Sequence, residues 1–161
     1  MPNEKKIQIV EDLKRNIESS SILIAADYTG VNVAEISALR TALREQGMQF
    51  KVVKNTLALI AADQSGNSKL KELIDGPTSF VFGFNDPVEP IRVLTNFIQR
   101  SGSAVKVRGA LMGDSLLTTE EVDYMASLPD RATLLSRLLG QLQAPISGLA
   151  TVLNAPTQGL V

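Results

Sequence analysis

The chain has 161 residues, of which 44% are hydrophobic and 20% are charged, and its formal net charge is −1 at pH 7. This composition is typical of a soluble globular protein with one core and an appendage, and it argues against a disordered or fibrous architecture. The sequence contains no cysteine and no histidine, which excludes disulfides, thiolate nucleophiles, cysteine zinc sites and histidine-dependent catalysis. The two common glycine-rich phosphate loops are also absent, so we expect no enzyme activity, no metal site and no cofactor.

The sequence also lacks the signals that direct a chain to a membrane. Its longest apolar runs, residues 22–26 and 57–62, are far shorter than a membrane span. The polar start, residues 1–6, leads into an amphipathic segment without the apolar stretch of a signal peptide. We therefore expect a cytoplasmic protein.

The first predicted element is an amphipathic helix, because apolar residues recur at helical spacing, at Ile7, Val10, Leu13 and Ile17. An apolar strand over 21–27 and a turn at 28–30 follow. Asn32 can cap the next helix, which Gly47 ends. Residues 48–53 alternate like a strand, and Asn55 can cap a helix over 56–62.

The second half of this region repeats the strand and helix signals. A short helical turn over 70–74 ends at Gly76, and residues 78–84 form the third predicted strand. A helix then starts at Asp86 and Pro87, and after Gly102 an alternating fourth strand begins near Val105. Residues 109–117 predict a hairpin, and Thr118 with Glu121 form a capping box for a last short helix through Ser127.

Without the opening and extra helices, the order is strand, helix, strand, strand, helix, strand. This order predicts an α+β fold of the ferredoxin-like type, in which two β-α-β halves form one sheet with helices mainly on one face. A doubly wound parallel sheet is the alternative.

The composition changes after Pro129. From Arg131 onward only Arg131 and Arg137 are charged, while leucine recurs at positions 134, 135, 138, 139, 142, 149, 153 and 160. We expect a domain over 1–129 and a leucine-rich helical extension over 130–161. A helical hairpin packed on its own domain is one interpretation, with a break or kink at Pro145. The scarcity of charge favours the other, helices that await partner helices.

A basic segment gives the second functional signal. Lys51 and Lys54 lie beside the start of the helix at Asn55 and Thr56, where backbone N–H groups and the helix dipole suit a phosphate. Arg40 lies four residues from Arg44, so both share a helix face that can extend the patch. A solvated edge with an ordinary helix cap explains the same pattern. Because the net charge is slightly negative, any RNA contact must be a local patch.

Five motifs resemble a known family and occur in its order. They are Y-T-G-V at 28–31, L-R-x-x-L-R at 39–44, V-V-K-N-T-L at 52–57, G-P-T at 76–78 and A-P-I-S-G-L at 144–149. Together they resemble the bacterial large-subunit ribosomal protein L-ten family, the stalk-base proteins, over nearly the whole chain.

This resemblance implies a scaffold on the cytoplasmic ribosome. The N-terminal domain of such a protein binds large-subunit ribosomal RNA beside ribosomal protein L-eleven. Its C-terminal helix carries dimers of the stalk protein L-seven/L-twelve, which recruit translation factors and stimulate their GTP hydrolysis. The alternative that the resemblance also admits is an RNA-binding regulator that acts off the ribosome on its own messenger.

The resemblance also assigns residues to each role. The RNA side comprises Tyr28, Gly30, Arg40, Arg44, Lys51, Lys54, Asn55 and Thr56. The stalk-binding helix comprises Ile146, Leu149, Val152, Leu153, Leu160 and Val161. Family members commonly continue this helix with further apolar residues and a charged tail that this sequence lacks, so the number of stalk dimers stays open. Pro156 predicts a kink or break near 154–156 that would separate two binding segments.

Overall fold

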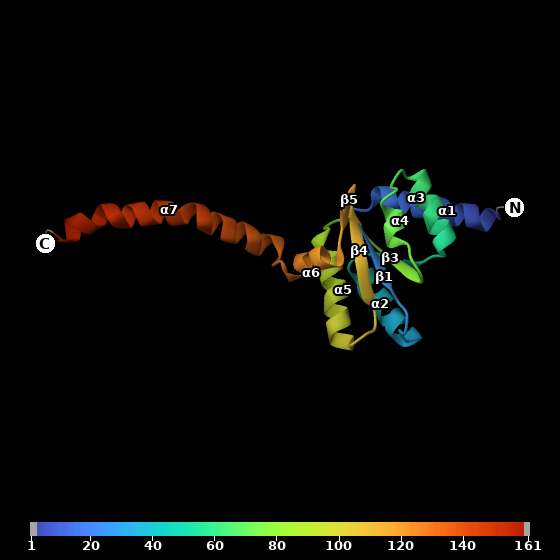
Figure 1. Cartoon of the computed structure of the whole chain (residues 1–161). Helices are drawn as coiled ribbons and strands as arrows, with labels where there is room; N and C mark the ends of the chain where they lie inside the picture. Colours follow the sequence, from blue (N-terminus) through green and yellow to red (C-terminus); the bar gives the residue numbers. More distant parts are fainter. Residues whose placement is uncertain (1–2, 160–161) are drawn as a thin grey trace. The chain divides into compact units, whose positions relative to one another are not determined.

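The computed structural model describes residues 3–159. The chain divides into two compact units, Met1–Ser127 and Leu128–Val161. The first, which we call the α/β unit, holds a sheet and the helices α1 to α6, and the second holds the long helix α7 (Figure 1).

The sheet of the α/β unit has the order β2-β3-β1-β4-β5. Every strand pairing is antiparallel. The first four strands therefore have the predicted ferredoxin-like order, in which each β-α-β connection skips one strand. The doubly wound alternative is wrong, because β3 separates β1 from β2 and runs antiparallel to both. The strands are β1 (Ile22–Asp27), β2 (Gln49–Val52), β3 (Thr78–Gly83), β4 (Lys106–Met112) and β5 (Ser115–Leu117).

Helices cover both faces of this sheet, which differs from the expectation of helices mainly on one face. The two β-α-β helices, α2 (Val33–Glu45) and α5 (Val88–Ser101), pack on the face that includes Ile22 and Ile24. The helices α1 (Glu4–Ser19), α3 (Asn55–Gln64) and α4 (Leu70–Leu73) cover the opposite face, as Figure 1 shows. The second face is also apolar, through buried side chains at Leu23, Ala25, Phe80 and Phe82, and so needs its own cover.

The local start and turn signals act largely as predicted. Thr118 and Glu121 make the reciprocal contacts of a capping box, with the Thr118 N–H 2.8 Å from Glu121 Oε2, at the start of α6 (Thr119–Ser127). β4 and β5 form the predicted hairpin, in which Met112 pairs with Ser115.

The two asparagine caps are wrong in detail. Asn32 stands at the N-cap of α2 but makes no capping hydrogen bond through its side chain. Asn55 is already the first residue of α3, and Lys54 is the N-cap. The Asn55 side chain is occupied elsewhere, because it donates to the Gly76 carbonyl oxygen at 2.7 Å.

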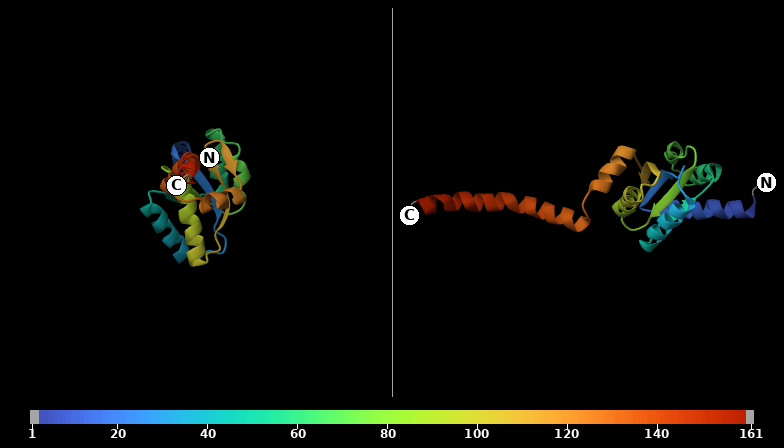
Figure 2. Two further views of the ribbon diagram at one scale, coloured as in Figure 1. Left: turned by 90° about the vertical axis from the view of Figure 1, so that its left-hand side faces the viewer. Right: turned by 90° about the horizontal axis from the view of Figure 1, so that it is seen from below.

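The C-terminal unit forms one helix where a hairpin was an alternative. Helix α7 (Arg131–Gly159) has 29 residues and contains both Pro145 and Pro156, and Figure 2 draws it as one continuous helix. A kink or break was expected near 154–156, and the break is wrong, because the helix continues through Pro156. Each proline removes one backbone donor, but the neighbouring turns keep their own hydrogen bonds, so the helix continues past the missing bond. Despite its length, α7 lacks the apolarity of a membrane-crossing helix, and so does every other helix within residues 3–159.

Candidate functional site

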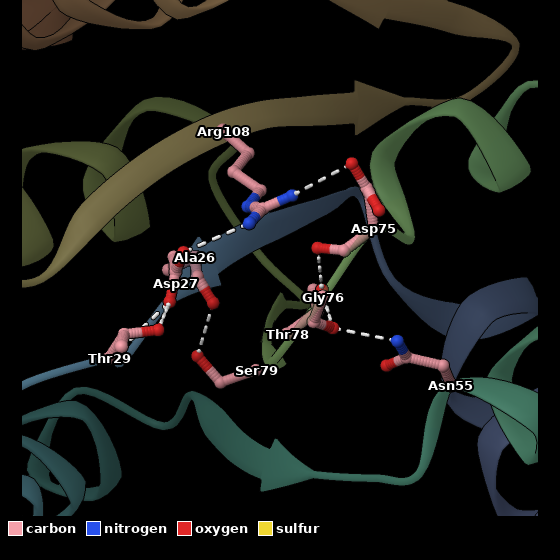
Figure 3. A network of polar contacts seen from close by, with 9 residues as sticks. All are labelled: Ala26, Asp27, Thr29, Asn55, Asp75, Gly76, Thr78, Ser79 and Arg108. Carbon is pink, nitrogen blue, oxygen red and sulfur yellow. Dashed lines mark hydrogen bonds and ion pairs between the residues drawn. The ribbon is translucent and has the colours of Figure 1, made fainter.

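Several of the motifs singled out in the sequence lie at one end of the strands of the sheet. Because neighbouring strands are antiparallel, the last residues of β1 and β2 lie beside the first residues of β3 and β4 at this end. The loop after β1, the start of α3 and the loop before β3 therefore come close together, although they lie far apart in the sequence. Figure 3 shows the polar contacts that join them.

Asp27, the last residue of β1, is the centre of these contacts. Its Oδ1 accepts hydrogen bonds from the backbone N–H of Thr29, at 2.9 Å, and from the Thr29 hydroxyl. Its Oδ2 accepts from Arg108 Nη2 at 2.9 Å. The hydroxyl of Thr29, the guanidinium of Arg108 and the N–H of Thr29 together lower the pKa of Asp27 to about 2. The carboxylate is therefore charged throughout the physiological range and fixes the start of the β1–α2 loop.

A β-bulge directs Arg108 toward Asp27. Ala26 pairs with Val107 and Ala25 pairs with Gly109, so Arg108 is the extra residue between two registered pairs. A bulge turns a side chain away from its regular direction, and here the guanidinium spans two loops. Nη2 bonds Asp27, and Nη1 lies 3.9 Å from the Asp75 carboxylate in the loop before β3.

The same loop is held to α3 on its other side. Asn55 donates to the carbonyl of Gly76, and the Thr78 hydroxyl donates to the same oxygen at 3.1 Å. Gly76 has φ +66, and a Cβ there would lie 3.2 Å from Arg108 Nη2. A side chain at this position would be both strained and crowded, which gives the glycine of the G-P-T motif a structural reason.

The start of α3 leaves backbone donors open beside this network. The first N–H groups of a helix have no acceptor within it, and the exposed residues Lys54 and Thr56 flank them. This arrangement suits an anion such as a phosphate. The chain therefore presents open donors and a cation on the same turn.

All four cations predicted on the RNA side can reach a ligand from solvent. Arg40, Lys51 and Lys54 line one surface groove of about 550 Å³, and Arg44 lies one turn further along α2, exposed. Within residues 3–159, none of the four lies within 4.0 Å of a carboxylate oxygen. We call Arg40, Arg44, Lys51 and Lys54 the basic patch.

Tyr28 and Gly30 lie at the same end of the strands but away from the basic patch. They follow β1, which β3 separates from β2, and a Cβ on Gly30 would lie 3.8 Å from Ala104, just before β4. The structure thus brings the basic patch together with the start of α3 and places the Tyr28 turn two strands away. Sequence reasoning missed Asp27, Asp75 and Arg108. An Asp followed two residues later by Thr is a signature of a side-chain turn, whereas no local signal marks the bulge at Arg108.

Helix α7 carries the second candidate surface. Nine large apolar side chains are exposed along it, from 39% at Leu134 to 70% at Ile146. At 100° per residue they all fall within an arc about 140° wide. We call this set the apolar stripe; it comprises Leu134, Leu135, Leu138, Leu139, Leu142, Ile146, Leu149, Val152 and Leu153.

The stripe contains four of the six residues predicted to bind stalk protein, at Ile146, Leu149, Val152 and Leu153. The other two, Leu160 and Val161, lie outside the described residues. Because α7 is unbroken, the leucines before Pro145 join the same stripe as those after it. No metal site competes with either surface, since residues 3–159 contain no group of three or more acidic, histidine or cysteine side chains placed to hold an ion.

Comparison with known proteins assigns both parts of the chain to one family. Residues 1–99 match the family model for ribosomal protein L10, and residues 128–158 match that for the ribosomal protein uL10 C-terminal region. A relative in Dehalococcoides mccartyi, named large ribosomal subunit protein uL10, is 40% identical over 97% of this chain and 92% of its own length. A relative of the same name in Roseiflexus castenholzii is 39% identical over 95% of this chain and 81% of its own.

These matches cover both the α/β unit and α7, in the order that the motifs occupy in the sequence. Ribosomal proteins are structural components and not enzymes, and in bacteria they work on the ribosome in the cytoplasm. The chain is thus a ribosomal structural protein, and it belongs to the ribosomal protein L10 family of the large subunit.

Proposed function

We propose that this protein binds large-subunit ribosomal RNA through the α/β unit and anchors dimers of the stalk protein L-seven/L-twelve along α7. The bound dimers would recruit translational GTPases to the ribosome. The observation that carries the proposal is the apolar stripe, a continuous row of exposed apolar side chains on a helix with two charged residues, Arg131 and Arg137.

The spacing along the stripe supports a helical partner. Leu135, Leu139, Leu142, Ile146, Leu149 and Leu153 follow one another at intervals of four and three residues. Alternating intervals of four and three are the a/d repeat of a coiled coil, whose seam is covered by another helix. Exposed apolar surface of this extent is rare on a protein that works alone. A helix of the stalk protein is the occupant that we propose.

The basic patch supports RNA as the ligand of the α/β unit. Its four cations have no carboxylate partner among residues 3–159, and Lys54 stands beside the open N–H groups of α3. Phosphate oxygens satisfy both features. We include Tyr28, Gly30, Asn55 and Thr56 in the proposed RNA side because they lie at the same end of the strands, and we expect ribosomal protein L-eleven beside it.

The proposal assigns the two roles to separable parts of the chain, residues 1–129 for RNA and 130–161 for the stalk protein. Removing residues 130–161 should leave a fragment that melts cooperatively, binds 23S ribosomal RNA like the full chain and no longer binds stalk dimers. Calorimetry with purified stalk dimers and filter binding with ribosomal RNA measure the two activities. A fragment that unfolds, or that still binds stalk dimers, would contradict the assignment.

Co-sedimentation tests the place of action. The full chain should sediment with large subunits in a sucrose gradient at physiological salt. A chain that stays in the soluble fraction with a messenger RNA would instead be a regulator that acts off the ribosome.

A further inference from the structure

The groove beside the basic patch has features that phosphate binding alone leaves unused. It lies at the outer edge of β2, the edge strand, and the consecutive residues from Phe50 to Lys54 line it. Its volume of about 550 Å³ falls in the range of sites that hold small organic groups. We call it the β2 groove.

Apolar side chains make up much of the lining of the β2 groove, from both faces of the edge strand. Val52 of β2 is 43% exposed and Ile9 of α1 is 41% exposed, and Leu57 of α3 lines the groove on the side of α1. Phosphates avoid such surfaces, whereas the flat face of a nucleobase gains from covering them. The apolar part of the lining therefore favours a ligand with an aromatic or aliphatic part.

The charged side chains that line the groove favour an anionic ligand. Arg40, Lys51 and Lys54 line it, against a single carboxylate at Asp12. The neighbouring groove between α1 and α3, of about 520 Å³, shows no such preference, because one lysine, Lys6, faces one glutamate, Glu11. Charge complementarity thus distinguishes the β2 groove, and its ligand combines an apolar plane with negative charge.

Arg40 supplies a flat surface that is already in position. Its Cζ lies 5.8 Å from the centroid of the Phe50 ring, within the range of a cation–π contact. The Arg40 side chain is also exposed, and unstacked RNA bases commonly lie on arginine planes and aromatic rings. An edge strand also offers unpaired backbone N–H and C=O groups, and the Asp12 carboxylate can accept from an exocyclic amino group.

We propose that the β2 groove binds one unstacked nucleobase of the RNA, a base with an exocyclic amino group, while the cations of the basic patch hold the flanking phosphates. The inference rests on the proposed RNA binding and adds a specific site for a base. It predicts that part of the affinity depends on a flipped-out nucleotide and not only on backbone charge.

Two tryptophan variants test the groove. Ile9→Trp adds a large side chain to its lining, whereas Tyr124→Trp places the same side chain on α6 at a position that is 68% exposed and does not line the β2 groove. Neither variant changes a charge. Ile9→Trp should weaken binding to 23S ribosomal RNA by about ten- to a hundredfold, the range for one stacked base, with an unchanged salt slope because every phosphate contact is kept. Tyr124→Trp should change it by less than about twofold.

Small probes test the base directly in the unmodified full chain. In titrations followed by amide NMR, adenosine 5′-monophosphate should shift the resonances of residues 50–54 more strongly than ribose 5-phosphate or uridine 5′-monophosphate. Equal shifts from adenosine monophosphate and ribose 5-phosphate would overturn the base site and leave a phosphate site.

The remaining outcomes separate this inference from the proposed function. If the unmodified chain binds no ribosomal RNA, the proposed function itself fails. If it binds RNA but both tryptophan variants bind equally well, the base site is overturned and RNA binding stands. If Ile9→Trp keeps RNA and nucleotide binding but loses a ribosomal protein from the assembled subunit, the groove is a protein site and the inference is wrong.

Discussion

In the α/β unit, apolar side chains close two layers of core, and the charged side chains are left outside these layers, four of them in the basic patch. In α7 the arrangement is reversed: the large apolar side chains are exposed, and charge is nearly absent. A self-contained unit uses its hydrophobic surface for its own stability, whereas a helix that exposes such a surface gains stability only when a partner covers it. The contrast supports the proposed division of roles, with an anionic ligand on the α/β unit and an apolar partner on α7.

Placing charge in the apolar stripe tests this difference between the two parts most directly. Leu149 and Leu153 are 61% and 66% exposed, so changing both to Asp should leave melting of the α/β unit unchanged. Because burial of one leucine contributes about 1.5 to 3 kcal/mol, loss of two should abolish the stalk complex at micromolar concentrations. Calorimetric titration with stalk dimers measures the effect.

A matched control adds the same two charges to the opposite face of α7, through Ser147→Asp with Thr151→Asp. This control should keep the affinity and the stoichiometry. If both double variants bind equally well, the stalk contacts lie elsewhere; if Leu149→Asp with Leu153→Asp lowers the melting temperature of the α/β unit, the stripe belongs to that core.

Reversing charge in the basic patch should have the next largest effect. Lys51→Glu with Lys54→Glu should weaken ribosomal RNA binding broadly, and removal of each phosphate contact should flatten the slope of log K against log salt by about 0.7 to 0.9. Stalk binding should be unchanged. The control is Lys14→Glu with Arg15→Glu, which changes the net charge by the same amount. These two residues lie near the end of α1, which leads to the start of β1, at the other end of the strands. If both double variants gave the same slope of log K against log salt, the basic patch would not be the RNA site.

The network behind the patch should contribute a smaller amount. Arg108→Gln removes the cation from Asp27 and Asp75 and should lower the free energy of unfolding by about 1 to 2 kcal/mol, because the Asp27 side chain is only 18% exposed. Urea unfolding measures it, with Arg100→Gln in the last turn of α5 as the control. Because Asp27 and Arg108 contact each other, adding Asp27→Asn to Arg108→Gln should lower the free energy of unfolding only a little further. Additive losses would show that the contact is not coupled.

The smallest expected effect is a change in the stability of the folded chain at acidic pH. The pKa of Asp27 is lowered to about 2 from 3.8, so its ionised form stabilises the folded state fully above about pH 4. That contribution is lost as the pH falls through about 2. Asp27→Asn should therefore be less stable than the unmodified chain at pH 7, and the difference should narrow between pH 4 and 2. A constant difference across this window would mean that the charge of Asp27 does not matter.

Local patterns in the sequence determined most elements of the α/β unit. The apolar spacing of α1, the Thr118–Glu121 capping box and the alternation along β4 depend on near neighbours in the chain, so they can be predicted without the fold. The strand and helix order was also sufficient for the ferredoxin-like sheet, and the motif series for the family. The extra helices reversed one expectation, because the second face of β1 and β3 is as apolar as the first.

Contacts between distant residues were decided by the tertiary structure alone. Arg108 reaches Asp27 across 81 positions because of a bulge, Asn55 bonds Gly76 instead of capping its helix, and Arg40 lies over Phe50 at the edge of β2. No periodicity encodes such contacts, since they depend on strand register and on how helices cross the sheet. Pro145 is the converse case: its local penalty predicted an interruption, but the hydrogen bonds of the turns on both sides outweigh one missing hydrogen bond. The helix therefore continues, and its continuity aligns the leucines on both sides of Pro145 into a single stripe.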